Sequence, residues 1–309
     1  MSLMGKIVCK VVAKDNVNPN LNDHIVKTLR EKNKYVYEQK EEFDFSVIDV
    51  AGTPMERLCS KNADPNKIIL YFHGGAYLHK LHNRHRSVAE YFAKKTDYVI
   101  YMPNYRVAPE DKYPSALEDG EKCYDYLLSS GFDPKKIAFM GDSAGGNLAL
   151  ALMLKLRDEN KPLPFTALLF SPWADMLASG ETYKTLYSTD LLFGEKGKTL
   201  DESNREKLLD SDIFLYCKDA DRTSPYVSPV YGEYNGFPRM AIVAAKNEML
   251  LADTLTIAEK LKKTGVEPAL MIKHKMFHDY LLAIKYCREA KQAANFAIKF
   301  MKSVETRDN

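Results

Sequence analysis

Short apolar runs alternate with longer amphipathic segments along most of this chain. Six of the runs are five or six residues long and rich in β-branched and aromatic residues, which is typical of buried strands. These runs span residues 67–72, 98–102, 136–140, 165–170, 240–245 and 269–273. Strands that are apolar on both faces favour a parallel sheet covered by helices on each side.

Segments with apolar residues at helical spacing lie between most of these predicted strands. They span residues 84–95, 115–128, 144–158, 251–264 and 280–301. Because parallel strands need long crossover connections, this alternation predicts an α/β fold with a mostly parallel sheet flanked by helices. Two earlier segments, residues 42–50 and 56–60, predict antiparallel strands at the leading edge of that sheet.

The alternation stops between residues 174 and 236. Polar clusters and aromatic residues dominate this region, and residues 201–209 and 212–218 predict short helices inserted between two strands. The start of the chain lacks strand character, and residues 21–31 predict an amphipathic helix that packs beside the insertion. We therefore expect a helical cap built from residues 1–40 and 174–236, and an α/β core built from residues 41–173 and 237–309.

Composition and charge argue against several classes of partner. The 309 residues include 44 basic and 42 acidic side chains, and the net charge of +2 gives neither a nucleic-acid footprint nor a polybasic membrane patch. The chain has no apolar stretch of membrane-spanning length and no long apolar segment at its start, which argues against secretion and stable membrane insertion.

The cysteines indicate a cellular compartment. They are five in number, widely scattered and without a CxxC pair, so they predict neither a disulfide framework nor a cysteine zinc site. These cysteines are Cys9, Cys59, Cys123, Cys217 and Cys287. Free thiols of this kind fit a reducing cytoplasm best.

A candidate nucleophile lies between a predicted strand and a predicted helix. Residues 141–145 read Gly-Asp-Ser-Ala-Gly, a GxSxG pattern in the strand-turn-helix context that a nucleophile elbow requires. Gly141 and Gly145 leave room for a sharp turn, so that Ser143 can hold its hydroxyl clear of the sheet at a helix N-terminus. The alternative is an ordinary glycine-rich turn between strand and helix.

A serine nucleophile needs a histidine that accepts its proton. Five of the seven histidines lie early in the chain, at His24, His73, His79, His82 and His85. His274 and His278 follow the last predicted strand, which is the place for a triad histidine in the order Ser, acid, His. We prefer His278, because it lies in the loop beyond the strand, whereas His274 is predicted to be still on the strand.

The histidine in turn needs a carboxylate that orients it, and two candidates follow the preceding strand. Glu248 is closer to the end of the predicted strand 240–245. Asp253 falls in the first turn of the next predicted helix, where a carboxylate commonly caps the helix or compensates its dipole. We therefore prefer Glu248 as the triad acid, with Asp253 as the alternative.

A glycine-rich loop that could bind an oxyanion directly follows the predicted strand 67–72. Residues 73–76 read His-Gly-Gly-Ala, and backbone N–H groups in such a loop can stabilise the negative charge of a tetrahedral intermediate. The N–H of Ala144, at the start of the helix after the nucleophile, would complete the site. In isolation this segment could equally be an ordinary Gly-Gly turn.

Five motifs in order resemble the hormone-sensitive lipase family of carboxylesterases. They are Tyr-Phe-His-Gly-Gly-Ala-Tyr at 71–77, Asn-Tyr-Arg-Val-Ala-Pro-Glu at 104–110 with Tyr-Pro-Ser-Ala-Leu-Glu-Asp at 113–119, Gly-Asp-Ser-Ala-Gly-Gly-Asn-Leu at 141–148, Ser-Pro-Trp at 171–173 and Ser-Pro at 228–229. The resemblance runs from about Ile68 to the C-terminus. It implies an α/β-hydrolase fold with an eight-stranded core and a helical cap, and oxyanion donors at Gly74, Gly75 and Ala144.

Two positions depart from the pattern of this family. The third glycine of the family's usual His-Gly-Gly-Gly motif is Ala76 here. The family usually has aspartate at the acid position, where this chain has Glu248. Glutamate can also orient an imidazole, although its arm is longer.

The function that the resemblance implies is hydrolysis of small short-chain acyl esters by Ser143, His278 and Glu248 through an acyl-enzyme. This chemistry needs no metal and no organic cofactor. The expected partner is a small-molecule ester, and the expected protein assembly is a homodimer. The same triad also serves amidases, peptidases and deacetylases. A further alternative is a non-catalytic ligand-binding module, like plant hormone receptors that resemble this family but lack the histidine; the presence of His278 argues against it.

Overall fold

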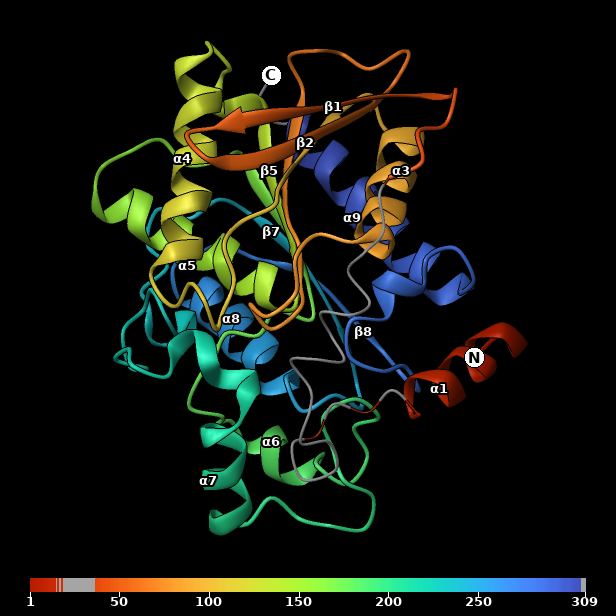
Figure 1. The fold of residues 1–309 in the computed structure, drawn as a ribbon, viewed down its shortest axis with the longest axis vertical. Helices are drawn as coiled ribbons and strands as arrows, with labels where there is room; N and C mark the ends of the chain where they lie inside the picture. Colours follow the sequence, from red (N-terminus) through yellow and green to blue (C-terminus); the bar gives the residue numbers. More distant parts are fainter. Residues whose placement is uncertain (15, 17, 19–36, 307–309) are drawn as a thin grey trace.

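The computed structural model describes residues 1–14, 16, 18 and 37–306, and its centre is one sheet of eight strands (Figure 1). The strands are β1 (Phe43–Val50), β2 (Thr53–Ser60), β3 (Ile68–Phe72), β4 (Val99–Pro103), β5 (Ile137–Asp142), β6 (Thr166–Phe170), β7 (Met240–Ala245) and β8 (Ala269–Lys273). They are ordered β1-β2-β4-β3-β5-β6-β7-β8 across the sheet. Only β1 and β2 pair antiparallel to their neighbours, so the predicted mostly parallel α/β sheet is confirmed.

The β1–β2 hairpin is longer than the sequence pattern indicated. Strand β2 begins at Thr53, three residues before the predicted start, and Val50 pairs with Thr53 across a tight turn at Ala51 and Gly52. The sequence pattern missed this extension because of Pro54. Proline has no N–H to donate to a neighbouring strand and therefore argues against a strand. In the structure Pro54 lies near the start of the strand, opposite Asp49.

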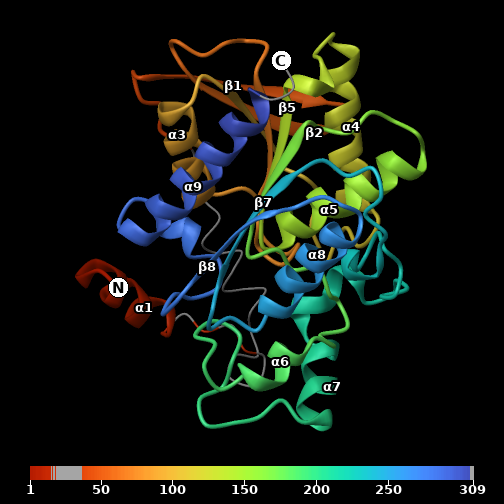
Figure 2. The same cartoon turned by 180° about the vertical axis from the view of Figure 1, so that it is seen from behind.

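Helices cover both faces of the sheet (Figures 1 and 2). Alternate strand residues face each layer. On one side lie α3 (Asn83–Lys95) and α9 (Arg288–Glu305), and on the other α4 (Ser115–Ser129), α5 (Ala144–Asp158) and α8 (Leu251–Lys263). Leu70 and Phe72 of β3 pack in the α5 layer, whereas Ile69 and Tyr71 pack in the α9 layer. This division follows from the period of two along a strand.

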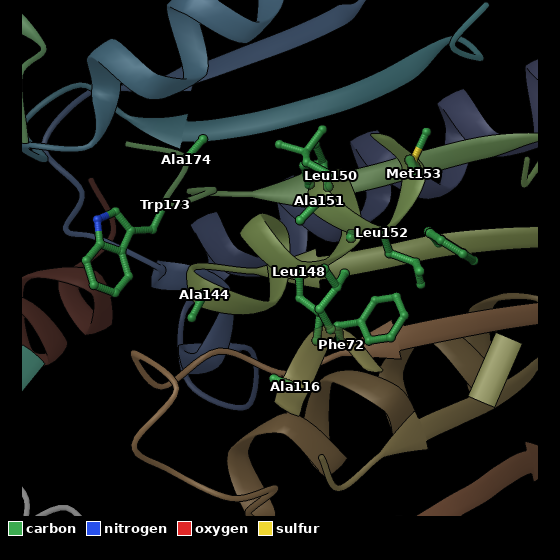
Figure 3. Close-up of a cluster of buried hydrophobic side chains, with 14 of the residues drawn as sticks. Phe72, Ala116, Ala144, Leu148, Leu150, Ala151, Leu152, Met153, Trp173 and Ala174 are labelled. Atoms are coloured by element: carbon green, nitrogen blue, oxygen red, sulfur yellow. The ribbon is translucent and has the colours of Figure 1, made fainter. Parts of the chain in front are cut away.

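Helix α5, which begins directly after the candidate nucleophile, is the most deeply buried helix of its layer. Figure 3 shows several of its side chains in the apolar core. Leu148 and Leu152 lie on one side of this helix and Leu150 on the opposite side, and each is at most 1% exposed, as expected of a helix that is apolar all round. A Cβ atom on Gly146 would lie 2.9 Å from the Cα atom of Pro172, so glycine lets this helix approach the chain after β6. The nucleophile therefore stands on a rigid element.

The predicted helix at residues 280–301 is wrong in its first part. A short 3-10 helix, η4 (Tyr280–Ala283), is followed by extended backbone at Cys287, and α9 begins only at Arg288. No glycine or proline marks this break in the sequence. Instead, the apolar side chains of Tyr280, Ile284 and Cys287 are packed in the same buried cluster as α9, so tertiary packing overrides the local helical pattern.

The segments between β6 and β7 lie beyond the carboxyl ends of the parallel strands (Figure 1). They include α6 (Glu181–Thr185), α7 (Glu202–Asp210) and the 3-10 helices η2 (Asp212–Cys217) and η3 (Pro229–Tyr231). The predicted helix at residues 21–31 and His24 fall outside the described residues. Helix α1 (Leu3–Val12), which the pattern did not predict, is held to α9 by hydrogen bonds from Ser2 to the Glu289 carboxylate.

Candidate active site

Ser143 occupies the sharp turn between β5 and α5, with φ 50° and ψ −118°. This conformation is unusual for a residue with a side chain, and it holds the hydroxyl away from the sheet. The two flanking glycines are required by space: a Cβ on Gly141 would lie 2.3 Å from the Gly145 oxygen, and a Cβ on Gly145 would lie 2.0 Å from the Phe72 oxygen. The GxSxG spacing thus reflects close backbone packing around the serine.

His278 lies within hydrogen-bonding distance of both Ser143 and Glu248. Its Nε2 atom is 2.8 Å from Ser143 Oγ, and its Nδ1 atom is 2.9 Å from Glu248 Oε2. All three residues are buried, at 3%, 7% and 0% exposure for His278, Ser143 and Glu248. The chain of contacts has the geometry in which a carboxylate fixes the imidazole tautomer and the imidazole accepts a hydroxyl proton.

Glu248 reaches the histidine from the turn after β7. Its other carboxylate oxygen, Oε1, accepts a hydrogen bond of 2.9 Å from the N–H of Ala245, the last residue of that strand. One oxygen thus anchors the carboxylate to its own strand while the other faces the imidazole. This double contact compensates for the longer arm of glutamate, because it leaves the side chain one orientation.

The two alternative residues lie outside this chain of contacts. His274 is exposed in the turn one residue beyond the end of β8, and the expectation that it is on the strand is wrong by that residue. Asp253 is buried in α8, where its Oδ2 atom accepts hydrogen bonds from the N–H groups of Ala174 and Asp175 and from the Tyr183 hydroxyl. Burial, and next the charge of Asp175, raise the pKa of Asp253 well above its usual range. Asp253 therefore braces the chain after β6.

The loop after β3 departs from the expectation for Gly74. The Gly74 N–H already donates to Asp142 Oδ2, at 3.0 Å, and a Cβ on Gly74 would lie 2.3 Å from the same oxygen. The Gly74 N–H is therefore engaged within the protein, whereas the family resemblance implied that it would donate to the oxyanion. The backbone then turns through positive φ at Gly75 (119°), Ala76 (54°) and Tyr77 (57°). Reversed backbone of this kind can turn successive N–H groups to one side.

Ala76 is a residue of this loop that the sequence interpretation noted as a departure from the family pattern and did not assign to the site. Its N–H and those of Gly75 and Ala144 have no acceptor among the residues that the structure describes. The signal in the sequence was the alanine itself, which stands where the family pattern has a third glycine and which here adopts a conformation that favours glycine.

The four histidines at residues 73–85 form a packed cluster beside this loop. The His73 ring stacks on Tyr105 with 4.2 Å between centroids, and its Nδ1 atom lies 2.8 Å from the Gly74 oxygen. Burial lowers the pKa of His73 to about 3, so the ring is neutral near pH 7. Within the described part of the chain, no group of histidine, cysteine or acidic side chains is arranged to hold a metal ion. These rings support the loop by packing.

Asp190, a residue between β6 and β7 that the sequence did not single out, connects the segment after α6 to the candidate acid Glu248. Asp190 Oδ1 accepts hydrogen bonds from the N–H groups of Leu192 and Phe193, and its Oδ2 atom accepts the N–H of Met249, next to Glu248. The Phe193 ring is thereby held against His278, with 5.0 Å between ring centroids. A short aspartate turn of this type has no distinctive sequence pattern, because Asp is common in turns.

Comparison with known proteins gives consistent similarities. The family described as the alpha/beta hydrolase fold matches residues 69–282. An esterase of Acinetobacter venetianus is 30% identical and aligns over 84% of this chain and 82% of its own. Among solved structures, EstE5 soaked with p-nitrophenyl butyrate superposes with a TM-score of 0.87 at 29% identity, covering 99% of this chain and 100% of that one. An esterase of the bacterial hormone-sensitive lipase family gives 0.82 at 26% identity, covering 98% and 99%.

Proposed function

The chain belongs to the hormone-sensitive lipase family of α/β-hydrolase carboxylesterases, and on this basis we propose that it hydrolyses small short-chain acyl esters with Ser143, His278 and Glu248. The observation that carries the proposal is the pair of contacts made by one imidazole, 2.8 Å to the serine hydroxyl and 2.9 Å to the glutamate. Each contact lies within the range that proton transfer and orientation of the base require.

In the proposed reaction, His278 Nε2 takes the hydroxyl proton while Ser143 Oγ attacks the ester carbonyl carbon. Glu248 holds the Nδ1 proton and stabilises the imidazolium that forms. The imidazolium then gives its proton to the departing alkoxide, so an alcohol leaves and an acyl-enzyme remains. Water repeats the same steps on the acyl-enzyme, releasing the acid and restoring the serine. Every proton moves between groups of this chain, substrate and water.

The oxyanion of each tetrahedral intermediate would be held by the N–H groups of Gly75, Ala76 and Ala144. This proposal keeps Gly75 and Ala144 from the sequence interpretation and replaces Gly74, whose N–H donates to Asp142. The N–H of Ala144 lies at the N-terminus of α5, where the helix dipole favours negative charge. Donors fixed in advance by the backbone stabilise developing charge without reorganisation.

Ser143→Ala tests the proposal with p-nitrophenyl acetate and p-nitrophenyl butyrate as substrates. We expect turnover to fall by about a thousandfold or more, because the nucleophile is removed while the scaffold stays intact. A fluorophosphonate probe should label the wild type and fail to label the variant. Ser130→Ala, at an exposed position after α4, is the matched control and should keep wild-type turnover and labelling. Unchanged hydrolysis by the purified Ser143→Ala protein would refute the assignment, and an unlabelled wild type would favour a non-catalytic binding module.

We also propose the cytoplasm as the compartment. Support comes from the thiols: all five cysteines are free, and four of them are buried. No helix in the described part of the chain is long and apolar enough to cross a bilayer. Fractionation of cells that express the protein would test the location. The homodimer stays a prediction, to be tested by measuring the mass of the protein in solution.

A further inference from the structure

Two buried carboxyl groups flank the proposed catalytic residues along the chain. Asp142 directly precedes Ser143, and Asp279 directly follows His278. The two residues are 0% and 7% exposed. Each carboxyl group is a hydrogen-bond partner of the other. The nucleophile elbow and the histidine loop, which are distant in sequence, are thus joined through the neighbours of the reacting groups.

The hydrogen-bond partners of these two groups differ. Asp142 accepts two hydrogen bonds, from the Tyr71 hydroxyl to Oδ1 at 2.6 Å and from the Gly74 N–H to Oδ2 at 3.0 Å. Asp279 Oδ1 is buried and receives no donor from any described residue. Two ionised carboxylates have no proton to share, so a hydrogen bond between them requires one protonated partner. Asp142 has hydrogen-bond donors at both oxygens, as a carboxylate requires. The shared proton is therefore assigned to Asp279.

We propose that Asp279 is a positioning residue of the esterase reaction, whose carboxylic acid donates to the Asp142 carboxylate and so fixes the histidine loop against the oxyanion loop. Asp142 is the shared acceptor, since it also holds Gly74, the residue before the proposed donor Gly75. The Asp279 N–H is tied as well, to Ser171 Oγ at 3.1 Å. This role rests on the proposed function and extends it.

The charges around the pair keep the proton in place at neutral pH. Asp279 faces the carboxyl groups of Asp142 and Glu248, and the positive charge of Arg84 opposes their effect on its pKa. Burial, and next the charge of Asp142, raise the pKa of the Asp279 carboxyl well above its usual range. On the far side of Asp142, the His85 Nε2 atom lies 3.7 Å from Oδ2, and burial lowers the pKa of His85 so that this ring is neutral.

Loss of the Asp279 proton would place two like charges in contact inside the protein. The repulsion would push the histidine loop away from the nucleophile elbow, since Asp279 is bonded directly to His278 in the chain. Misplacement of a catalytic base by a fraction of an ångström already costs rate. The proposed device therefore makes kcat fall as pH rises through the pKa of Asp279.

The backbone of Asp279 allows a clean comparison of variants. Its φ of 53° lies in the left-handed region, which asparagine and glycine adopt readily. Asp279→Asn keeps an N–H donor toward Asp142 but cannot ionise, whereas Asp279→Gly removes the side chain without adding backbone strain. Asp253→Asn is the matched control, because it changes another buried carboxyl group of raised pKa, which joins α8 to the chain after β6.

The experiment measures kcat and KM for p-nitrophenyl butyrate against pH in the full-length variants. We expect Asp279→Asn to keep kcat within about threefold of wild type near pH 7 and to lose the alkaline fall of the wild type. We expect Asp279→Gly to lower kcat by about tenfold or more near pH 7, with KM changed by less than about threefold. Asp253→Asn should keep the alkaline midpoint of the wild type. An alkaline midpoint shared by the wild type and Asp279→Asn, or wild-type kcat in Asp279→Gly, would overturn the proposal.

Infrared spectroscopy separates this proposal from the proposed function, since it needs no activity. The difference spectrum between the wild type and Asp279→Asn at about pH 8 should contain the carbonyl band of a protonated carboxylic acid. A wild type without esterase activity that still shows this band would refute the function and leave the shared proton intact. A carboxylate band alone in the difference spectrum would overturn the shared proton itself.

Discussion

Gly74 donates its backbone N–H to Asp142 Oδ2 at 3.0 Å, across 68 positions of the sequence. The glycine begins the loop that carries the proposed oxyanion donors, and the aspartate directly precedes the nucleophile. One carboxylate therefore sets the distance between the serine and the loop. Such a fixed framework is what electrostatic stabilisation of a transition state requires, because donors that must reorganise lose most of their benefit.

Gly74→Ala should damage the reaction more than it damages folding. Its added Cβ would lie 2.3 Å from Asp142 Oδ2, so the loop must move away from the nucleophile. We expect kcat for p-nitrophenyl butyrate to fall by about a hundredfold. The control is Gly236→Ala, at φ 79° with no atom within 4 Å of the added Cβ, which should cost about 1 kcal/mol of stability without changing kcat. Equal losses of kcat in both variants would contradict the role assigned to the Gly74 contact.

Alanine substitution of the two candidate acids should have opposite effects on activity and stability. Glu248→Ala removes the carboxylate that faces His278 Nδ1, and we expect kcat to fall by about a hundredfold or more. Asp253→Ala removes the acceptor for two N–H groups and a hydroxyl, so we expect a loss of about 2 kcal/mol in the free energy of unfolding and a smaller change in kcat. Steady-state kinetics and urea unfolding of both variants measure the two effects. A larger loss of kcat in Asp253→Ala would reverse the assignment.

The central strands β3 to β7 could be predicted because they are buried throughout. Most helices could be predicted because their apolar residues recur at helical spacing. The run at residues 240–245 is buried throughout, and the helix at 144–158 begins and ends as predicted. Prediction failed where tertiary contacts decide the backbone. Extended backbone at Cys287 interrupts a segment with helical periodicity, and Pro54 lies inside a strand that its type argues against. Neither feature has a local cause that a residue pattern could reveal.

The residues of the candidate site could likewise be predicted only in part. Ser143, Glu248 and His278 could be chosen because each follows a strand that the apolar pattern locates, and their mutual distances agree with the chosen order. The direction of a backbone N–H cannot be read from residue types, since it depends on φ and ψ. The structure bonds the Gly74 N–H to Asp142, and Ala76 takes its place in the proposed oxyanion site. Asp190 escaped notice because its significance lies in a contact with Met249, 59 residues away.

Phe193→Ala should weaken catalysis without unfolding the protein. The ring lies 5.0 Å from the His278 imidazole, between centroids, and is only partly buried. Its removal admits water beside the imidazole and frees the ring to tilt, so we expect kcat/KM to fall by about tenfold. Leu192→Ala, at the neighbouring position of the same turn, is the control and should change kcat/KM by less than about twofold. Equal effects of the two substitutions would show that the turn as a whole, rather than the aromatic contact, supports the histidine.

Asp253 should make the protein less stable as pH rises. Burial, and next the charge of Asp175, raise its pKa well above the usual range, so the folded state keeps a proton that the unfolded chain loses near pH 4. Between that value and the raised pKa the folded state binds more protons, and the free energy of unfolding falls by up to about 1.4 kcal/mol per pH unit from this group. Asp253→Asn cannot ionise and should remove this contribution to the slope. Urea unfolding of both proteins between about pH 5 and pH 8 measures it, and parallel stability curves would mean that Asp253 is already ionised in the folded protein.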